Sequence, residues 1–156
     1  MPGSGACHMP LAWNETLSVN VDELDQQHRE IITRLRLLGD ALGADRRQSS
    51  TRGMAELVRC VAHHFRAEER FMRSRDYPRL GSHAQAHQVG LEALRSAERL
   101  LLASGPGERF RELVERSARW LDVHLRSEDL ALGNFVRDGS APPPAPAGKG
   151  LAVRAG

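Results

Sequence analysis

The sequence predicts an all-α protein, an up-down-up-down antiparallel four-helix bundle, and three observations support this prediction. Leu, Ala, Arg and Glu are plentiful and aromatic residues make up only 4% of the chain, a composition that favours helices over strands. Apolar residues recur at alternating spacings of three and four in four long segments. The connections between these segments are short, which makes consecutive helices antiparallel neighbours.

The first predicted helix covers residues 22–42, and Gly43 follows it as a stop signal. Its apolar stripe consists of Leu24, His28, Ile31, Leu35, Leu38 and Leu42. The second predicted helix covers residues 50–75 and ends before Tyr77-Pro78, because proline disfavours helix in the residue before it. Its stripe consists of Met54, Leu57, Val61, His64, Glu68 and Phe71.

The third predicted helix begins with Ser82 as its N-cap and ends at the breaker Ser104-Gly105-Pro106. Its stripe consists of His83, His87, Gly90, Leu94, Ala97 and Leu101. The fourth predicted helix covers residues 107–137. The residues expected to point inward from it are Phe110, Leu113, Ser117, Trp120, His124 and Ala131.

The length and the two ends of the chain indicate one domain between two tails. A chain of 156 residues with 40% apolar residues can form one substantial core and is too short for two domains. We expect this domain to cover residues 9–137. Residues 1–8 are Gly-rich and residues 138–156 are dominated by Ala, Pro and Gly, so both ends are expected to be disordered.

Charge and cysteine content exclude several classes of protein. The 22 basic and 20 acidic residues are spread along the chain without a block of one sign, so we expect no nucleic-acid partner. Two cysteines form no disulfide framework, and no apolar run reaches the length of a membrane span. These features predict a soluble cytoplasmic protein without a membrane partner.

Polar residues occupy core positions near one end of the predicted bundle. Each helix rises about 1.5 Å per residue, so the height of a residue follows from its distance to the helix end. The polar core positions are His28 early in the first helix, His64 and Glu68 late in the second, His83 and His87 early in the third and His124 late in the fourth. Antiparallel packing therefore brings them together.

A metal site accounts for this convergence. Burying an unpaired polar group costs about 1–3 kcal/mol, whereas a whole domain is stable by only about 5–15 kcal/mol. Residues four apart are neighbours on a helix, so His64 with Glu68 and His83 with His87 form two clamps. This set of ligands is too large for one ion, whereas two ions bridged by carboxylates would use it, so the residues predict a site with two metal ions. Imidazole suits iron, zinc and copper, and without H-E-x-x-H or C-x-x-C motifs iron is preferred over zinc.

These residues resemble the hemerythrin family, specifically its bacterial single-domain type, over about residues 10–135. The matching motifs are Trp13, Ser18-Val19, Leu24-Asp25-Gln26-Gln27-His28, His64-Phe65, Glu68-Glu69, Met72, Tyr77-Pro78, His83, His87, Trp120-Leu121, His124 and Asp129. The resemblance implies two iron ions joined by a bridging oxo or hydroxo oxygen. It also implies the following ligands: His83, His87 and His124 on one iron, His28 and His64 on the other, and Glu68 and Asp129 as bridges.

The ligand role of Asp129 follows from the resemblance and conflicts with regular helix geometry. Asp129 lies five residues after His124, so on an ideal helix the two point about 140° apart, and Glu128 is better placed. We therefore predict a local π-bulge near these residues that turns Asp129 inward. His63 is expected to be exposed. Cys60 is expected to be a small buried hydrophobe near the site, with a redox thiol as the alternative.

The resemblance implies reversible dioxygen binding at the less-liganded iron, for storage, delivery or supply to an oxidase. Trp120 is the candidate apolar wall of the oxygen pocket. Such a protein is not primarily an enzyme. Two alternatives stay open: a module that reports oxygen, redox state or iron to a signalling partner, and a di-iron enzyme that acts on peroxide or nitric oxide.

Overall fold

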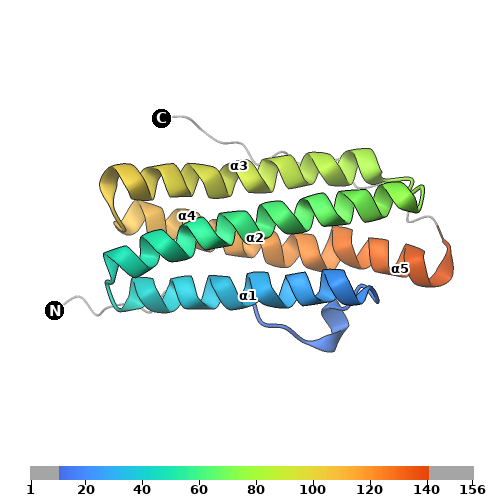
Figure 1. The fold of residues 1–156 in the computed structure, drawn as a ribbon, viewed down its shortest axis with the longest axis horizontal. Helices are drawn as coiled ribbons and strands as arrows, with labels where there is room; N and C mark the ends of the chain where they lie inside the picture. Colours follow the sequence, from blue (N-terminus) through green and yellow to red (C-terminus); the bar gives the residue numbers. More distant parts are fainter. Residues whose placement is uncertain (1–10, 141–156) are drawn as a thin grey trace.

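The computed structural model describes residues 11–140 and confirms the predicted bundle. Four long helical segments run alternately up and down, and α2 packs between α1 and α3 (Figure 1). No strand occurs in the described part of the chain. The expected tail at residues 1–8, and the expected tail at residues 138–156 beyond Ser140, lie outside the described residues.

The helices differ from the predicted ranges mainly at their ends. The short helix η1 covers Glu15–Leu17, and the bundle consists of α1 (Asp22–Gly43), α2 (Arg47–Ser74), α3 (Leu80–Ser104), α4 (Glu108–His124), the π-helix η2 (Leu125–Asp129) and α5 (Leu130–Asp138). The prediction of Ser82 as an N-cap is wrong, since α3 already begins at Leu80. The Ser82 hydroxyl instead donates a hydrogen bond to the Arg79 carbonyl within the first turn. None of the described helices is long and apolar enough to cross a lipid bilayer.

The buried faces follow the predicted stripes closely in α1, α2 and α3. Every predicted stripe residue of α1 and α3 is buried, and in α2 only Phe71 is half-buried. The stripe predicted for the fourth helix is partly wrong, because Leu113 and Trp120 of α4 and Ala131 of α5 are only half-buried. The centre of the buried face of α4 is formed by Phe110, Val114, Ser117, Ala118, Leu121 and His124. Spacings of three and four residues fit both the predicted stripe and the observed buried face of α4. Spacing alone therefore did not distinguish the fully buried residues from the half-buried ones beside them.

The segment before α1 is held to the bundle by Asp25, a buried carboxylate of α1. Asp25 accepts hydrogen bonds from the Ser18 hydroxyl at 2.6 Å and from the Val19 backbone amide at 2.8 Å. Val19 in turn lies against Gly133 of α5, where an added Cβ would come within 2.7 Å of the Val19 backbone. The N-terminal segment thereby packs against both the first and the last helix.

Gly90 of α3 allows close contact with Trp120 of α4. A Cβ added at Gly90 would lie 2.3 Å from the Trp120 ring, a distance that real atoms do not adopt. The same Trp120 ring stacks on His124 at a centroid distance of 4.7 Å. Because Gly90 has no side chain, the Trp120 ring has the space to stack on His124.

We predict that Gly90→Ala destabilises the fold by about 1–3 kcal/mol, the usual cost of overpacking a well-packed contact. Urea unfolding would measure this difference. The matched control is Gly81→Ala on the same helix, where nothing lies within 4 Å of an added Cβ. This control is expected to stabilise the protein by up to about 1 kcal/mol, because alanine is the better helix former. Equal effects of the two variants would contradict the packing role of Gly90.

Candidate metal centre

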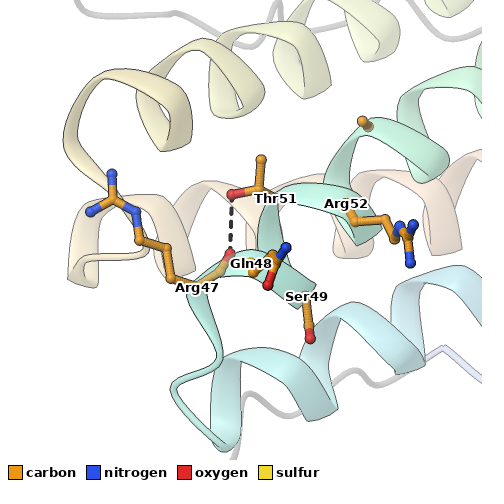
Figure 2. A pocket seen from close by; sticks show the side chains of 6 residues that line it. Arg47, Gln48, Ser49, Thr51 and Arg52 are labelled. Carbon is orange, nitrogen blue, oxygen red and sulfur yellow. Dashed lines mark hydrogen bonds between the residues drawn. The ribbon is translucent and has the colours of Figure 1, made fainter.

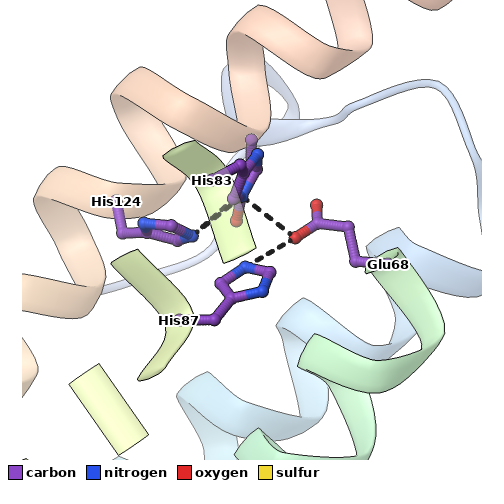
Figure 3. A group of neighbouring side chains, drawn as sticks. Glu68, His83, His87 and His124 are labelled. Atoms are coloured by element: carbon purple, nitrogen blue, oxygen red, sulfur yellow. Dashed lines mark hydrogen bonds and ion pairs between the residues drawn. The ribbon is translucent and has the colours of Figure 1, made fainter. Parts of the chain in front are cut away.

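Seven polar side chains converge near one end of the core, and each is at most 4% exposed. They are His28 of α1, His64 and Glu68 of α2, His83 and His87 of α3, His124 of α4 and Asp129 at the end of η2. Figure 3 shows Glu68 and three of the histidines turned toward a common centre. The structure therefore brings together all seven residues expected from the sequence and the resemblance.

The seven side chains form two overlapping groups that could each hold a metal ion. The first group consists of Glu68, His83, His87, His124 and Asp129, and the second of His28, His64, Glu68 and Asp129. Within each group, one candidate ligand atom per residue lies within 4.8 Å of all the others. Because only Glu68 and Asp129 belong to both groups, the two carboxylates lie between a three-histidine side and a two-histidine side.

The spacing of the donor atoms fits ligands that share an ion. Asp129 Oδ1 lies 3.0 Å from Nε2 of both His83 and His124, and Glu68 Oε2 lies 3.1 Å from Nε2 of His87. Two ligands bound at right angles to one ion, each at about 2.1 Å, are about 3.0 Å apart. The observed distances suit hydrogen bonds between these groups, and they also fit neighbouring ligands of one ion.

Several of these atoms have no hydrogen-bond partner although they are fully buried. They include both carboxylate oxygens of Glu68, Asp129 Oδ2 and His87 Nε2. His28 Nε2 also lies 3.0 Å from His64 Nε2, so both ring nitrogens face the same centre. Buried polar atoms are almost always paired, so this set calls for a cation between the donors.

Burial and mutual contacts set the charges of the cluster. Burial lowers the pKa of His64 to about 4, so this imidazole is neutral at neutral pH. Burial also disfavours charge on His83, but the carboxylates of Asp129 and Glu68 outweigh it and raise the pKa of His83 to about 10. Burial and the charge of Asp129 oppose ionisation of Glu68, yet the adjacent imidazoles lower its pKa to about 2. Burial likewise opposes ionisation of Asp129, but His124 and other histidines hold its pKa well below the usual range. Two ionised carboxylates therefore lie inside the core.

The predicted π-bulge is present as η2, Leu125–Asp129. It adds one residue to the turn after His124 and directs Asp129 into the cluster, where this residue is 1% exposed. Glu128 points outward and forms a two-pronged ion pair with Arg79, both oxygens lying 2.8 Å from Nη2. The widened turn thus places Asp129, and not Glu128, among the histidines.

Two outer hydrogen-bond partners of the histidines were not identified from the sequence. Gln27 Oε1 lies 3.1 Å from Nδ1 of His64, and Glu69 Oε1 lies 2.9 Å from Nδ1 of His87. An acceptor at Nδ1 keeps the proton there and leaves Nε2 free to face the cluster. Both residues directly adjoin a stripe position and occur in the motifs that resemble the family, but neither signal assigned them a contact with a histidine.

Aromatic rings cover the cluster on its core side. Phe65 stacks on His87 with centroids 3.9 Å apart and planes 6° from parallel. Trp120 stacks on His124 at 4.7 Å and 16°. Phe65 directly follows His64 in the sequence, and Trp120 precedes His124 by one turn. The cluster therefore has an apolar wall built by the same helices that carry its histidines.

His63 is exposed as expected, whereas the expectation for Cys60 is only partly met. Cys60 packs on the core cluster but is half-buried, and its thiol lies 3.5 Å from Glu30 Oε1. Burial and the Glu30 carboxylate raise the pKa of the Cys60 thiol, which disfavours the reactive thiolate.

A surface hollow on α2 is a different feature from this cluster. It has a volume of about 760 Å³ and lies at the beginning of α2 (Figure 2), where it is lined by Arg47, Gln48, Ser49, Thr51, Arg52 and Ala55. His64 is twelve residues beyond Arg52, about 18 Å along the helix. The lining includes no carboxylate, histidine or cysteine, so the polar cluster in the core is the better candidate site.

Comparison with known proteins identifies the family. The family model described as Hemerythrin HHE cation binding domain matches residues 19–136, which include all seven clustered residues. A bacteriohemerythrin of Stenotrophomonas maltophilia is 32% identical over 127 residues, covering 81% of this chain and 82% of the relative. A hemerythrin of Sipunculus nudus is 37% identical over 127 residues, covering 81% of this chain and 94% of the relative. The chain belongs to the hemerythrin family, of the bacterial type that the sequence resembles.

Proposed function

We propose that the chain binds dioxygen reversibly at two iron ions held by the seven clustered residues. The observation that carries this proposal is the pair of overlapping ligand groups that share Glu68 and Asp129 in the core. An iron pair supplies both the electrons and the coordination position that reversible dioxygen binding needs. Family membership supports iron as the metal, and the mixed imidazole and carboxylate donors suit it.

The unequal number of histidines supports a single binding position for dioxygen. We assign His83, His87 and His124 to one ion and His28 and His64 to the other, with the two carboxylates as bridges. If the bridges and one shared oxygen serve both ions equally, the two-histidine ion has one ligand fewer. The protein then has no need to release a ligand when dioxygen binds.

The surroundings of the cluster support binding over catalysis. The walls are formed by Phe65 and Trp120, and the seven donors are buried from water. All the histidines and carboxylates of the cluster are used as ligands in this assignment, so none is left over as a general acid or base. We propose that the chain's own residues position the metal pair and exclude water, with Trp120 as the wall of the oxygen pocket.

We predict two irons per chain and reversible changes in visible absorption. The protein is reduced without oxygen, exposed to air and then returned to an oxygen-free atmosphere, with metal content measured in parallel. Charge-transfer bands that form in air and disappear when oxygen is removed are expected. Rapid oxidation without recovery would exclude the carrier function and favour the sensor or enzyme alternatives.

Asp129 and Glu128 provide a matched pair for testing the ligand assignment. We predict that Asp129→Asn loses at least one iron per chain, because the ionised bridge between the two groups is removed. Glu128→Gln should keep two irons, since Glu128 pairs with Arg79 outside the cluster. Elemental analysis would count the metal, and circular dichroism would establish that both variants are folded. Equal iron content in both variants would refute the assignment of Asp129.

Removing the metal should lower thermal stability strongly. The unpaired buried donors each cost about 1–3 kcal/mol without their ion, and 1 kcal/mol shifts the melting temperature of a domain of this size by about 2–4 °C. We therefore expect the chelated protein to melt at least about 10 °C below the metal-bound form. Differential scanning calorimetry would measure both forms, and equal melting temperatures would contradict metal binding by the buried donors.

A further inference from the structure

The exposed face of α2 carries a row of arginines that runs along most of the helix. The row consists of Arg52, Arg59, Arg66, Arg70 and Arg73, with His63 between them, and all six side chains are exposed. Four of the arginines are seven residues apart, which is close to two helical turns, so they drift by only about 20° per step. At about 1.5 Å per residue the row is about 32 Å long.

The acidic residues of α2 do not neutralise this row, because each is engaged elsewhere. Glu56 pairs with Arg34 of α1, Glu69 contacts His87 of α3 and Glu68 lies in the polar cluster. Within residues 11–140, none of the five row arginines forms an ion pair or a side-chain hydrogen bond. The row is therefore a patch of unbalanced positive charge.

Exposed arginines on the other helices have acidic partners more often. Arg99 pairs with Glu92 on α3, and Arg126 pairs with Asp122 where α4 continues into η2. Surface pairs of this kind contribute little to stability, but they cancel the local charge. The five row arginines thus form a continuous set of exposed, unpaired positive charges along one face of α2.

The middle of the row lies beside the polar cluster. His63 is exposed in the row, and the next residue, His64, is inside the cluster. A surface hollow of about 280 Å³ is lined by Gln27, Glu30, Arg59, Cys60 and His63. Gln27 also contacts Nδ1 of His64, so one side chain separates this hollow from a cluster histidine.

We propose that the arginine row docks an acidic, one-electron carrier protein that reduces the metal pair. This inference depends on the proposed function, because oxidised iron needs a reductant to regain the form that binds dioxygen. Two encounters balance the reaction: each reduced carrier gives up one electron, and two ferric ions become two ferrous ions. Carboxylates on the carrier would face the arginines and place its redox group over the hollow at Gln27.

The chemistry of the row favours such a protein over a membrane or nucleic acid. The apolar face of α2 is buried in the bundle, and the exposed large apolar residues of the described chain, Leu37, Val89, Leu102 and Val123, lie on other helices. The row therefore has nothing to insert into a lipid surface. Neither lipid nor nucleic acid would supply electrons, whereas the row borders a hollow whose lining residue Gln27 contacts His64.

An acidic flavodoxin provides a defined probe for the test. Calorimetric titration of oxidised flavodoxin into the metal-containing protein measures docking at 20 mM and 200 mM salt. Stopped-flow mixing with flavodoxin reduced to its hydroquinone measures the rate at which the visible bands of the oxidised iron pair disappear. We expect docking and reduction at low salt, and both should weaken at least tenfold at high salt because exposed charges are screened.

Charge-reversal variants distinguish the effect of the arginine row on docking from the effect of the protein's net charge. The triple variant Arg59→Glu, Arg66→Glu and Arg73→Glu should lose at least tenfold in affinity and in reduction rate at low salt. The control Arg36→Glu, Arg95→Glu and Arg116→Glu changes three other exposed arginines by the same total charge, and should lose less than threefold. The triple variant Arg59→Lys, Arg66→Lys and Arg73→Lys should retain docking, because it keeps the charge.

Three results would overturn the proposal. They are equal losses in the two charge-reversal variants, reduction rates that do not depend on the row, and tighter binding of the row to a 20-base-pair DNA duplex or to phosphatidylglycerol vesicles than to flavodoxin. The calorimetric measurement does not require iron. A protein that lacks iron but binds flavodoxin through the row would refute the oxygen-binding function and leave the docking surface intact.

Discussion

The structure depends on the charge balance around two buried carboxylates, Glu68 and Asp129. Each is at most 1% exposed and ionised, and a carboxylate without a counter-charge in such surroundings would cost several kcal/mol. Five imidazoles surround them, drawn from all four long segments of the bundle. The helices are therefore coupled to one another through this polar centre as well as through their apolar stripes. Under the proposed function, two bound metal ions would supply further counter-charge.

The π-helix is the adjustment that makes this arrangement possible in the last segment. A regular helix after His124 would direct Glu128 toward the core and Asp129 away from it. One additional residue in the turn reverses the directions of these two side chains, and Glu128 pairs with Arg79 outside the polar cluster. Since π-helical turns are less favourable than α-helical ones, the interactions of Asp129 with His83, His124 and His28 are what stabilise the turn.

Some features of the fold and of the candidate metal centre could be predicted from the sequence, and others could not. Stripe positions such as His28 and His87 follow from helical periodicity, because periodicity is a local property. The start of α3 before Ser82 and the flank position of Trp120 depend on how the helices pack, which spacing does not report. Gln27 and Glu69 lie outside the stripes, and only the partner helix shows that they contact cluster histidines.

The arginine row shows how folding can create a feature that composition conceals. The chain has nearly equal numbers of basic and acidic residues, and along the sequence they are well mixed. In the bundle, Glu56 and Glu69 turn toward neighbouring helices while the arginines between them face outward. The same helix that supplies His64 and Glu68 to the core therefore presents positive charge to solvent. If the centre exchanges electrons as proposed, α2 combines His64, which contacts a side chain at the surface hollow, with a row of positive charge that can attract an acidic partner.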